Sequence, residues 1–254
     1  MTKIKDIYGY IDELAPYSLQ ESYDNSGINI FLGEGEIKKA VIALDITSEV
    51  AEEAKREGAQ LIITHHPVIF RPLKNINAEN IAVRLCRYGI SAISAHTNFD
   101  SAKLNGILCE RLGLAQKEPL AVENGVPMGI VCETEGEYSP AELAKLIKER
   151  LGNTVVRYND TGESSFSKIA VCSGSGGSML GDAISKGCSA FITGDVKHDV
   201  FIDAHNAGIC VFDAGHFHTE NIFCGYMQNI LSERFPDVEF KTAQSGYDIL
   251  SYEI

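Results

Sequence analysis

The segment LIITHHPVIF, residues 61–70, joins a short apolar run to two adjacent histidines and a proline. Side chains of a regular strand alternate between its two faces, so adjacent histidines within a strand cannot share one face. Pro67 has no backbone N–H to continue a strand ladder, and it biases His66 towards an extended conformation. We therefore expect a buried strand that ends at His65, followed by a loop in which both imidazoles can reach neighbouring points of one cleft.

The sequence around this segment alternates short apolar runs with amphipathic stretches of about ten residues, a rhythm typical of parallel sheets built from βαβ units. In the first half, strands are predicted at residues 41–45, 61–65 and 90–95. The rhythm returns in the second half, with strands predicted at 128–133, 154–158, 168–174, 189–195 and 208–215. The sequence predicts an α/β protein with two similar α/β domains, each a largely parallel sheet flanked by helices.

A polar segment, AQKEPLAVENGVP at residues 115–127, separates the two halves of this pattern. Exposed polar stretches of this kind are where domain boundaries fall. We therefore predict an N-terminal domain at residues 1–123 and a C-terminal domain at residues 124–254, whose last segments could pack back on the first domain.

Composition narrows the function classes. The net charge of −13 argues against a nucleic-acid partner, because such proteins rely on basic patches. No apolar run reaches the roughly 18 residues of a membrane helix, and the acidic, amphipathic N-terminus does not read as a signal peptide. The seven cysteines include no CxxC pair, which favours small buried thiols in a reducing compartment. We expect a cytoplasmic protein without a membrane partner.

Polar side chains gather where the predicted strands end. In open α/β sheets, ligands bind outside the carboxyl ends of the strands. Every histidine except His205, which lies within a predicted helix, follows such an end. The polar or glycine residues at the strand ends are Asp45, Thr47, His65, His66, His96, Asn98, Asp100, Gly194, Asp195, His198, Asp213, His216, His218 and Glu220.

This residue set suits a metal site. Imidazole nitrogens and carboxylate oxygens, without cysteine, are ligands for Zn, Mn, Fe or a similar divalent ion. Two adjacent imidazoles suggest two ions, which in two-metal sites lie about 3.5–4 Å apart. His216 and Glu220 are four residues apart and share one face at the start of a helix. The competing interpretation is a set of scattered capping and surface residues, and the convergence of several clusters on one sheet edge favours the metal site.

Two further motifs leave alternatives open. CSGSGGSML, residues 172–180, lies between a strand and a helix, where its glycines could bring backbone amides to an anion or could simply form a tight turn. SYDNSG, residues 22–27, is explained by turn chemistry, with a functional role for Asp24 as the alternative.

Seven motifs, taken in order, resemble the GTP cyclohydrolase 1 type 2 homologue family, also called Nif-three-like proteins, over nearly the whole chain. They are YDNSG, LDIT, THHP, HTNFD, CSGSGGS, GDVKH and GHFHTE. The resemblance implies two similar α/β domains with a dinuclear metal site in the cleft between them, and a toroidal homohexamer with its sites facing the interior. The metal ligands that it implies are His65, His66, Asp100, His216 and Glu220.

The chain departs from the family pattern at two positions. Tyr23 stands where the family usually has tryptophan, and Asp199 stands where a second histidine often follows the GD motif. The second departure leaves the implied ligand set intact.

The resemblance and the residues together predict a two-metal hydrolase acting on GTP or a related nucleotide. The metals would polarise the substrate and lower the pKa of a bound water towards neutrality. His96 or His198, which lie outside the implied ligand set, could act as the acid–base group or hold a ligand in place. The alternatives are a non-catalytic metal-binding or regulatory scaffold and a two-metal phosphoesterase.

Overall fold

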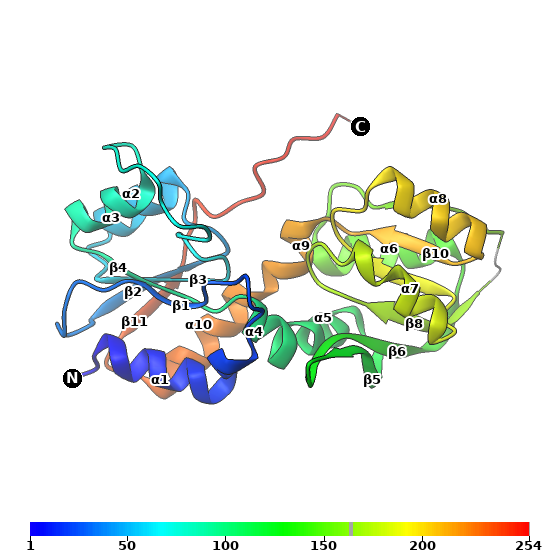
Figure 1. Cartoon of the computed structure of the whole chain (residues 1–254), viewed down its shortest axis with the longest axis horizontal. Helices are drawn as coiled ribbons and strands as arrows, with labels where there is room; N and C mark the ends of the chain where they lie inside the picture. Colours follow the sequence, from blue (N-terminus) through cyan, green and yellow to red (C-terminus); the bar gives the residue numbers. More distant parts are fainter. Residues whose placement is uncertain (163–164, 254) are drawn as a thin grey trace. The chain divides into compact units, whose positions relative to one another are not determined.

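The computed structural model describes residues 1–162 and 165–253, and the chain forms two compact units (Figure 1). The first unit contains Met1–Ala102 and Phe223–Tyr247, and the second contains Lys103–Ile222 and Asp248–Ile254. Each unit is a sheet flanked by helices, which confirms the predicted α/β class. The first unit is thus built from two separate stretches of chain.

The sheet of the first unit has five strands in the order β1-β4-β3-β2-β11. Strands β4, β3, β2 and β11 run parallel, and only β1, at the edge, is antiparallel to its neighbour β4. The three strands predicted in this region are all present. The bounds are Gly27–Ile30 for β1, Lys39–Ala43 for β2, Leu61–Thr64 for β3, Ser91–Ser94 for β4 and Glu239–Thr242 for β11.

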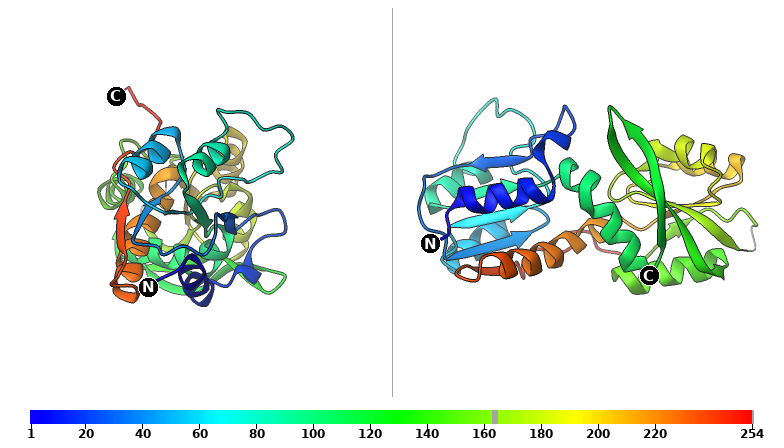
Figure 2. Two further views of the ribbon diagram at one scale, coloured as in Figure 1. Left: turned by 90° about the vertical axis from the view of Figure 1, so that its left-hand side faces the viewer. Right: turned by 90° about the horizontal axis from the view of Figure 1, so that it is seen from below.

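Helices cover both faces of this sheet, so its central strands are buried on both sides (Figures 1 and 2). Helices α2 (Ser48–Arg56) and α3 (Ile81–Tyr88) pack on the face that carries Val41 and Ile62. Helices α1 (Ile4–Leu14) and α10 (Ile222–Arg234) lie on the opposite face. A short helical segment, η1 (Tyr17–Leu19), follows α1, and two more follow β4: α4 (Thr97–Phe99) and the π-helical η2 (Asp100–Leu104).

The sheet of the second unit has six strands in the order β5-β6-β8-β9-β10-β7. Its centre is parallel, formed by β8 (Phe166–Val171), β9 (Ala190–Thr193) and β10 (Cys210–Asp213). Strands β5 (Ala115–Glu123), β6 (Val126–Tyr138) and β7 (Arg157–Tyr158) are antiparallel to their neighbours.

Residues 115–127, where the sequence places a domain boundary, form β5 and the beginning of β6. The turn between these strands is Asn124-Gly125, with φ of 50° and 83°. Two consecutive positive φ angles are the requirement of the tight hairpin turn that Asn-Gly favours. The polar character of the segment reflects its exposed position at the edge of a sheet.

Helices also cover both faces of the second sheet. Helices α5 (Asn105–Leu112) and α6 (Pro140–Leu151) pack against one face. Helices α7 (Leu180–Ser185) and α8 (His198–Ala207) pack against the other, and η3 (Gly177–Met179) leads into α7. Helix α9 (His216–Glu220) follows β10. The cap predicted for α6 is present, since the Ser139 hydroxyl accepts from the Glu142 amide and Pro140 is the first helical residue.

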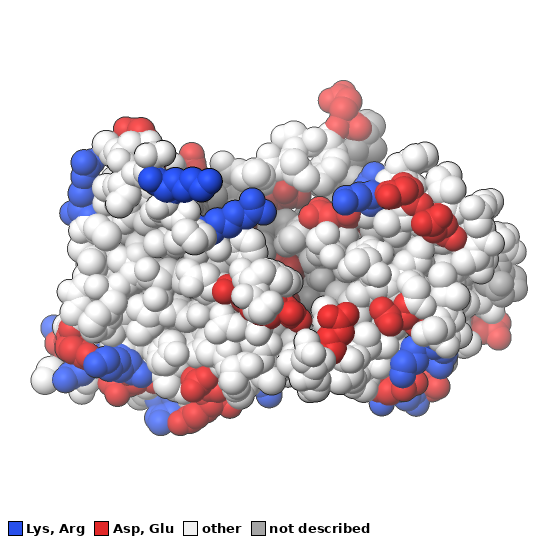
Figure 3. All heavy atoms as spheres, in the orientation of Figure 1, with Lys and Arg blue, Asp and Glu red and all other residues white. Residues whose placement is uncertain are grey.

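The charged surface is mixed. On the face drawn in Figure 3, basic side chains form small separate groups interspersed with acidic ones. None of the helices within the described residues is long and apolar enough to cross a membrane.

Candidate metal centre

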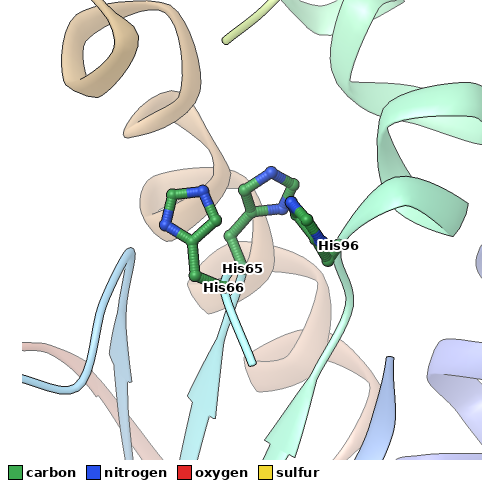
Figure 4. Close-up of side chains that lie close together, drawn as sticks. All are labelled: His65, His66 and His96. Carbon is green, nitrogen blue, oxygen red and sulfur yellow. The ribbon is translucent and has the colours of Figure 1, made fainter. Parts of the chain in front are cut away.

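Three histidines of the first unit lie together at the carboxyl edge of its sheet (Figure 4). Strands β2, β3 and β4 are adjacent and parallel, so the residues that follow them are neighbours. The ring centroids of His65, His66 and His96 are 5.0, 5.1 and 5.2 Å apart. Their ligating nitrogens lie within 4.8 Å of one another, close enough to hold a metal ion.

The first histidine of the THHP motif is completely buried. Its Nδ1 lies 2.8 Å from the carbonyl oxygen of Ala95, which can only accept, so Nδ1 carries the proton and donates it. In the neutral ring the lone pair is then on Nε2 of His65, which lies 3.4 Å from the Asp100 carboxylate. The structure therefore brings two of the predicted ligands together, with Nε2 of His65 facing the carboxylate of Asp100.

The second histidine leaves the strand geometry, as predicted. Strand β3 ends at Thr64, and the Thr64 hydroxyl donates to the carbonyl of His66 at 2.8 Å. The His66 amide donates to the carbonyl of Leu44 at 3.0 Å. Its ring Nδ1 donates to the Asp45 carboxylate at 2.8 Å, so this imidazole is also held in the tautomer with the lone pair on Nε2.

His96, predicted as an acid–base group, is held by the buried carboxylate of Asp24. The distance from His96 Nδ1 to Asp24 Oδ1 is 2.8 Å, and the Asp24 side chain is fully buried. Burial alone would raise the pKa of this carboxyl, but hydrogen bonds from His96, Ser26 and Thr97 outweigh it and hold the pKa well below its usual range. Asp24 is therefore an ionised, buried anchor for the His96 ring.

Asp100 begins the π-helical segment Asp100–Leu104. π-Helical turns are rare overall, and those that occur are often found at functional sites. Its carboxylate projects from the end of the segment that follows β4, next to the buried ring of His65.

The second unit has its own histidine–carboxylate cluster at the carboxyl edge of β8, β9 and β10. His216 Nδ1 lies 2.8 Å from Asp195 Oδ2, and its Nε2 lies 2.9 Å from Glu220 Oε2. His216 and Glu220 are the first and last residues of α9, so they share a face as their spacing predicts. The Glu220 side chain is buried, with 4% of its surface exposed.

The proton on His216 is held tightly. Burial lowers the pKa of this ring, but the carboxylates of Glu220 and Asp195, both hydrogen-bonded to it, more than offset burial and raise the pKa to about 9. At neutral pH the metal-free protein therefore keeps an imidazolium between two carboxylates, which is an arrangement that a divalent cation could replace.

The other strand-end residues have different surroundings. His198, the second residue predicted as an acid–base group, is exposed at the first position of α8. His218 Nε2 lies 3.3 Å from the Asp248 carboxylate. Asp213 is buried and pairs with the Arg157 guanidinium, so its role is structural.

The donor set fits divalent metals that prefer imidazole and carboxylate ligands. His65, His66 and His216 each direct Nδ1 to an oxygen acceptor, which is the arrangement that metal-binding histidines use to fix tautomer and ring orientation. The carboxylates that hold these rings include Asp45 and Asp195, which the sequence places at strand ends but outside the implied ligand set. The sequence feature that indicates this role is their position: Asp45 follows β2, next to β3, and Asp195 follows β9, next to β10, so each follows a strand adjacent to the one that supplies its histidine.

Comparison with known proteins places these residues in a family context. The sequence model of Duf34/NIF3 (NGG1p interacting factor 3) matches residues 2–247. A Clostridium perfringens protein named GTP cyclohydrolase 1 type 2 homolog is 37% identical over 97% of this chain and 98% of its own length. The Helicobacter pylori protein (strain 26695) named GTP cyclohydrolase 1 type 2 is 36% identical over 91% of this chain and 92% of its own. The crystal structure of a Bacillus cereus protein related to NIF3 covers 99% of both chains with a TM-score of 0.92 at 22% identity, a likeness of fold.

Proposed function

The chain belongs to the Duf34/NIF3 family, and from that premise we propose that it is a metal-dependent hydrolase acting on GTP or a related nucleotide. The relatives' names support the reaction class, and the donor set supports the dependence on metal. What we propose for this chain is the substrate and the reaction.

One observation supports this function more than any other. The three histidines of the predicted ligand set share a single hydrogen-bonding pattern, with Nδ1 donating to the Ala95 carbonyl in one case and to the Asp45 or Asp195 carboxylate in the others. Histidines that merely cap helices have no reason to share this pattern. Metal ligands do, because the hydrogen bond at Nδ1 orients the ring and makes Nε2 more basic.

We propose that two divalent ions bind per chain, with Zn, Mn and Fe as the candidates. The proposed ligands outnumber the roughly three protein ligands of a typical catalytic zinc ion. When bound, the ions would polarise the substrate and lower the pKa of a coordinated water. The ligands proposed are His65, His66 and Asp100 of the first unit and His216 and Glu220 of the second.

The chain itself would handle the proton. His96 is proposed as the acid–base group, because Asp24 holds its Nδ1–H and so keeps the lone pair on Nε2, the atom that would accept a proton. His198 is the alternative, since it is exposed and able to contact a ligand in solution.

The test is a nucleotide panel with metal-loaded protein, in which product masses are measured and phosphate release is followed separately. We expect a metal-dependent product from GTP or another nucleotide, and expect His96→Gln to keep its metal but lose at least ten-fold in rate. His205→Gln, an exposed change within α8, is the matched control. Full metal loading without any product would instead favour a non-catalytic metal-binding protein. Phosphate released together with the dephosphorylated nucleotide, its base intact, would identify a phosphoesterase.

A further inference from the structure

The glycine-rich loop at residues 172–177 uses its backbone amides within its own unit. The Ser173 amide donates to Asn105 Oδ1 at 2.9 Å. The Gly174 amide donates to the Thr219 hydroxyl at 3.0 Å, and the Gly176 amide donates to the Thr193 hydroxyl at 2.9 Å. Of the two interpretations of this motif, the structure therefore supports a tight packed turn, since these amides are directed at side chains and not at an anion site.

The reason for glycine at position 174 lies in its neighbour. A Cβ atom built on Gly174 would overlap Oε1 of Glu220 and lie 3.1 Å from its Cδ and 3.5 Å from Cε1 of His216. The residue also has a φ of +60°, a left-handed conformation that side chains disfavour. Two independent constraints, space and backbone conformation, therefore exclude a side chain here.

The loop and the helix that carries Glu220 are also joined on the other side. The Thr219 hydroxyl accepts from the Gly174 amide and shares its one proton between the carbonyls of Gly215 and His216 at the start of α9. Glu220 is buried, so its carboxylate has little room to move away if the loop gains a side chain. The position of this carboxylate thus depends on the bare backbone at Gly174.

We propose that Gly174 is a positioning residue for the Glu220 carboxylate: the missing side chain lets this carboxylate lie against the loop with its second oxygen directed at His216. The inference rests on the proposed function insofar as Glu220 is a metal ligand. The close contact between Gly174 and Glu220 can be tested separately from metal binding.

The first experiment compares Gly174→Ala with Gly187→Ala by metal titration. Both glycines have positive φ, +60° and +68°, so both substitutions carry left-handed strain, but a Cβ at Gly187 would meet nothing within 4 Å. We expect Gly174→Ala to weaken Zn²⁺ or Mn²⁺ binding by ten-fold or more, in line with the effect of disturbing a ligand's support, and Gly187→Ala to change it less than about two-fold. Equal binding by the two variants would overturn the inference.

The second experiment works without metal and remains informative if Gly174→Ala folds poorly. Gly174→Ala is placed in wild-type and Glu220→Ala backgrounds, and melting is recorded in chelator. Because truncation of Glu220 removes the clash, the melting temperature should fall much less in the Glu220→Ala background. An equal fall in both backgrounds, whether or not the variants bind metal, would show that the two residues are not coupled and would overturn the inference.

A third variant separates the inference from the function on which it rests. If Glu220→Gln binds metal like the wild type, Glu220 is not a ligand and the proposed metal site is wrong, whatever the melting experiment shows. If Glu220→Gln loses metal while Gly174→Ala keeps it, the metal site stands and the positioning role of Gly174 fails.

Discussion

Asp24→Asn removes a buried carboxylate that accepts five hydrogen bonds beside His96. Oδ1 accepts from His96 Nδ1 at 2.8 Å and from the Asn25 amide at 2.7 Å. Oδ2 accepts from the Ser26 hydroxyl at 2.6 Å, and from the Thr97 hydroxyl and amide at 2.6 and 3.1 Å. Asparagine is nearly the same size but replaces one acceptor oxygen with an NH₂ group.

The magnitude follows from which donors lose their acceptor. If the new NH₂ takes the place of Oδ2, the two hydroxyls can rotate to accept from it, but the Thr97 amide cannot. If it takes the place of Oδ1, the Asn25 amide loses its acceptor, and His96 must move its proton to Nε2 so that Nδ1 can accept from the NH₂. Either orientation strands one backbone donor at about 1–3 kcal/mol and turns charge-assisted bonds into neutral ones, so we expect a loss of about 2–4 kcal/mol in the free energy of unfolding.

Thermal unfolding in chelator measures this loss without a contribution from bound metal. We expect the melting temperature to fall by roughly 4–16 °C, at about 2–4 °C per kcal/mol for a protein of this size. Because the pKa of Asp24 is lowered in the folded state, its stabilisation is present above the unfolded carboxyl pKa of about 4 and is lost as pH falls towards the folded value. The gap between wild type and variant should therefore be constant from neutral pH to about pH 5 and narrow in stronger acid.

Asp45→Asn is the matched control. Asp45 also holds a histidine, but its side chain is 53% exposed and an asparagine oxygen can still accept from His66. The control should cost less than about 1 kcal/mol. If Asp24→Asn melts within 2 °C of the wild type, or if the two variants are equally destabilised, then the donors that lose their acceptor at Asp24 do not determine the stability of this region.

Three further outcomes are expected. By elemental analysis, Glu220→Gln should lose at least one metal ion while the fold survives. His218→Ala should keep its metal, because the His218 ring faces Asp248, and the reverse result would reject the ligand assignment. Burial lowers the pKa of His216, but Glu220 and Asp195 outweigh burial and raise it to about 9, so a metal ion must displace a proton to bind. The affinity for metal should therefore rise about ten-fold per pH unit up to about pH 9, and an affinity that is constant between pH 6 and 8 would contradict this. Light scattering at micromolar concentration should give the mass of a homohexamer, and a monomer mass would remove that proposal.

Local pattern determined much of this protein. Apolar runs mark β2, β3 and β4, because buried parallel strands need apolar side chains on both faces. Ser139 and Pro140 mark the start of α6, because caps satisfy amides within the first turn. The four-residue spacing of His216 and Glu220 is a property of the helix itself, and the residues after neighbouring strands had to lie at one edge of a sheet.

Tertiary structure decided the rest, wherever a contact joins distant parts of the chain. Strand β11 pairs with β2 although the partners Lys39 and Glu239 are 200 positions apart in the sequence, and no local period indicates which sheet such a strand joins. Asp24 reaches His96 across 72 residues, so its role could not be told from that of an ordinary turn residue. The glycine at position 174 is required by Glu220, whose carboxylate is brought against the loop only by the packing of α9, and close approach of this kind leaves no periodic trace in a sequence.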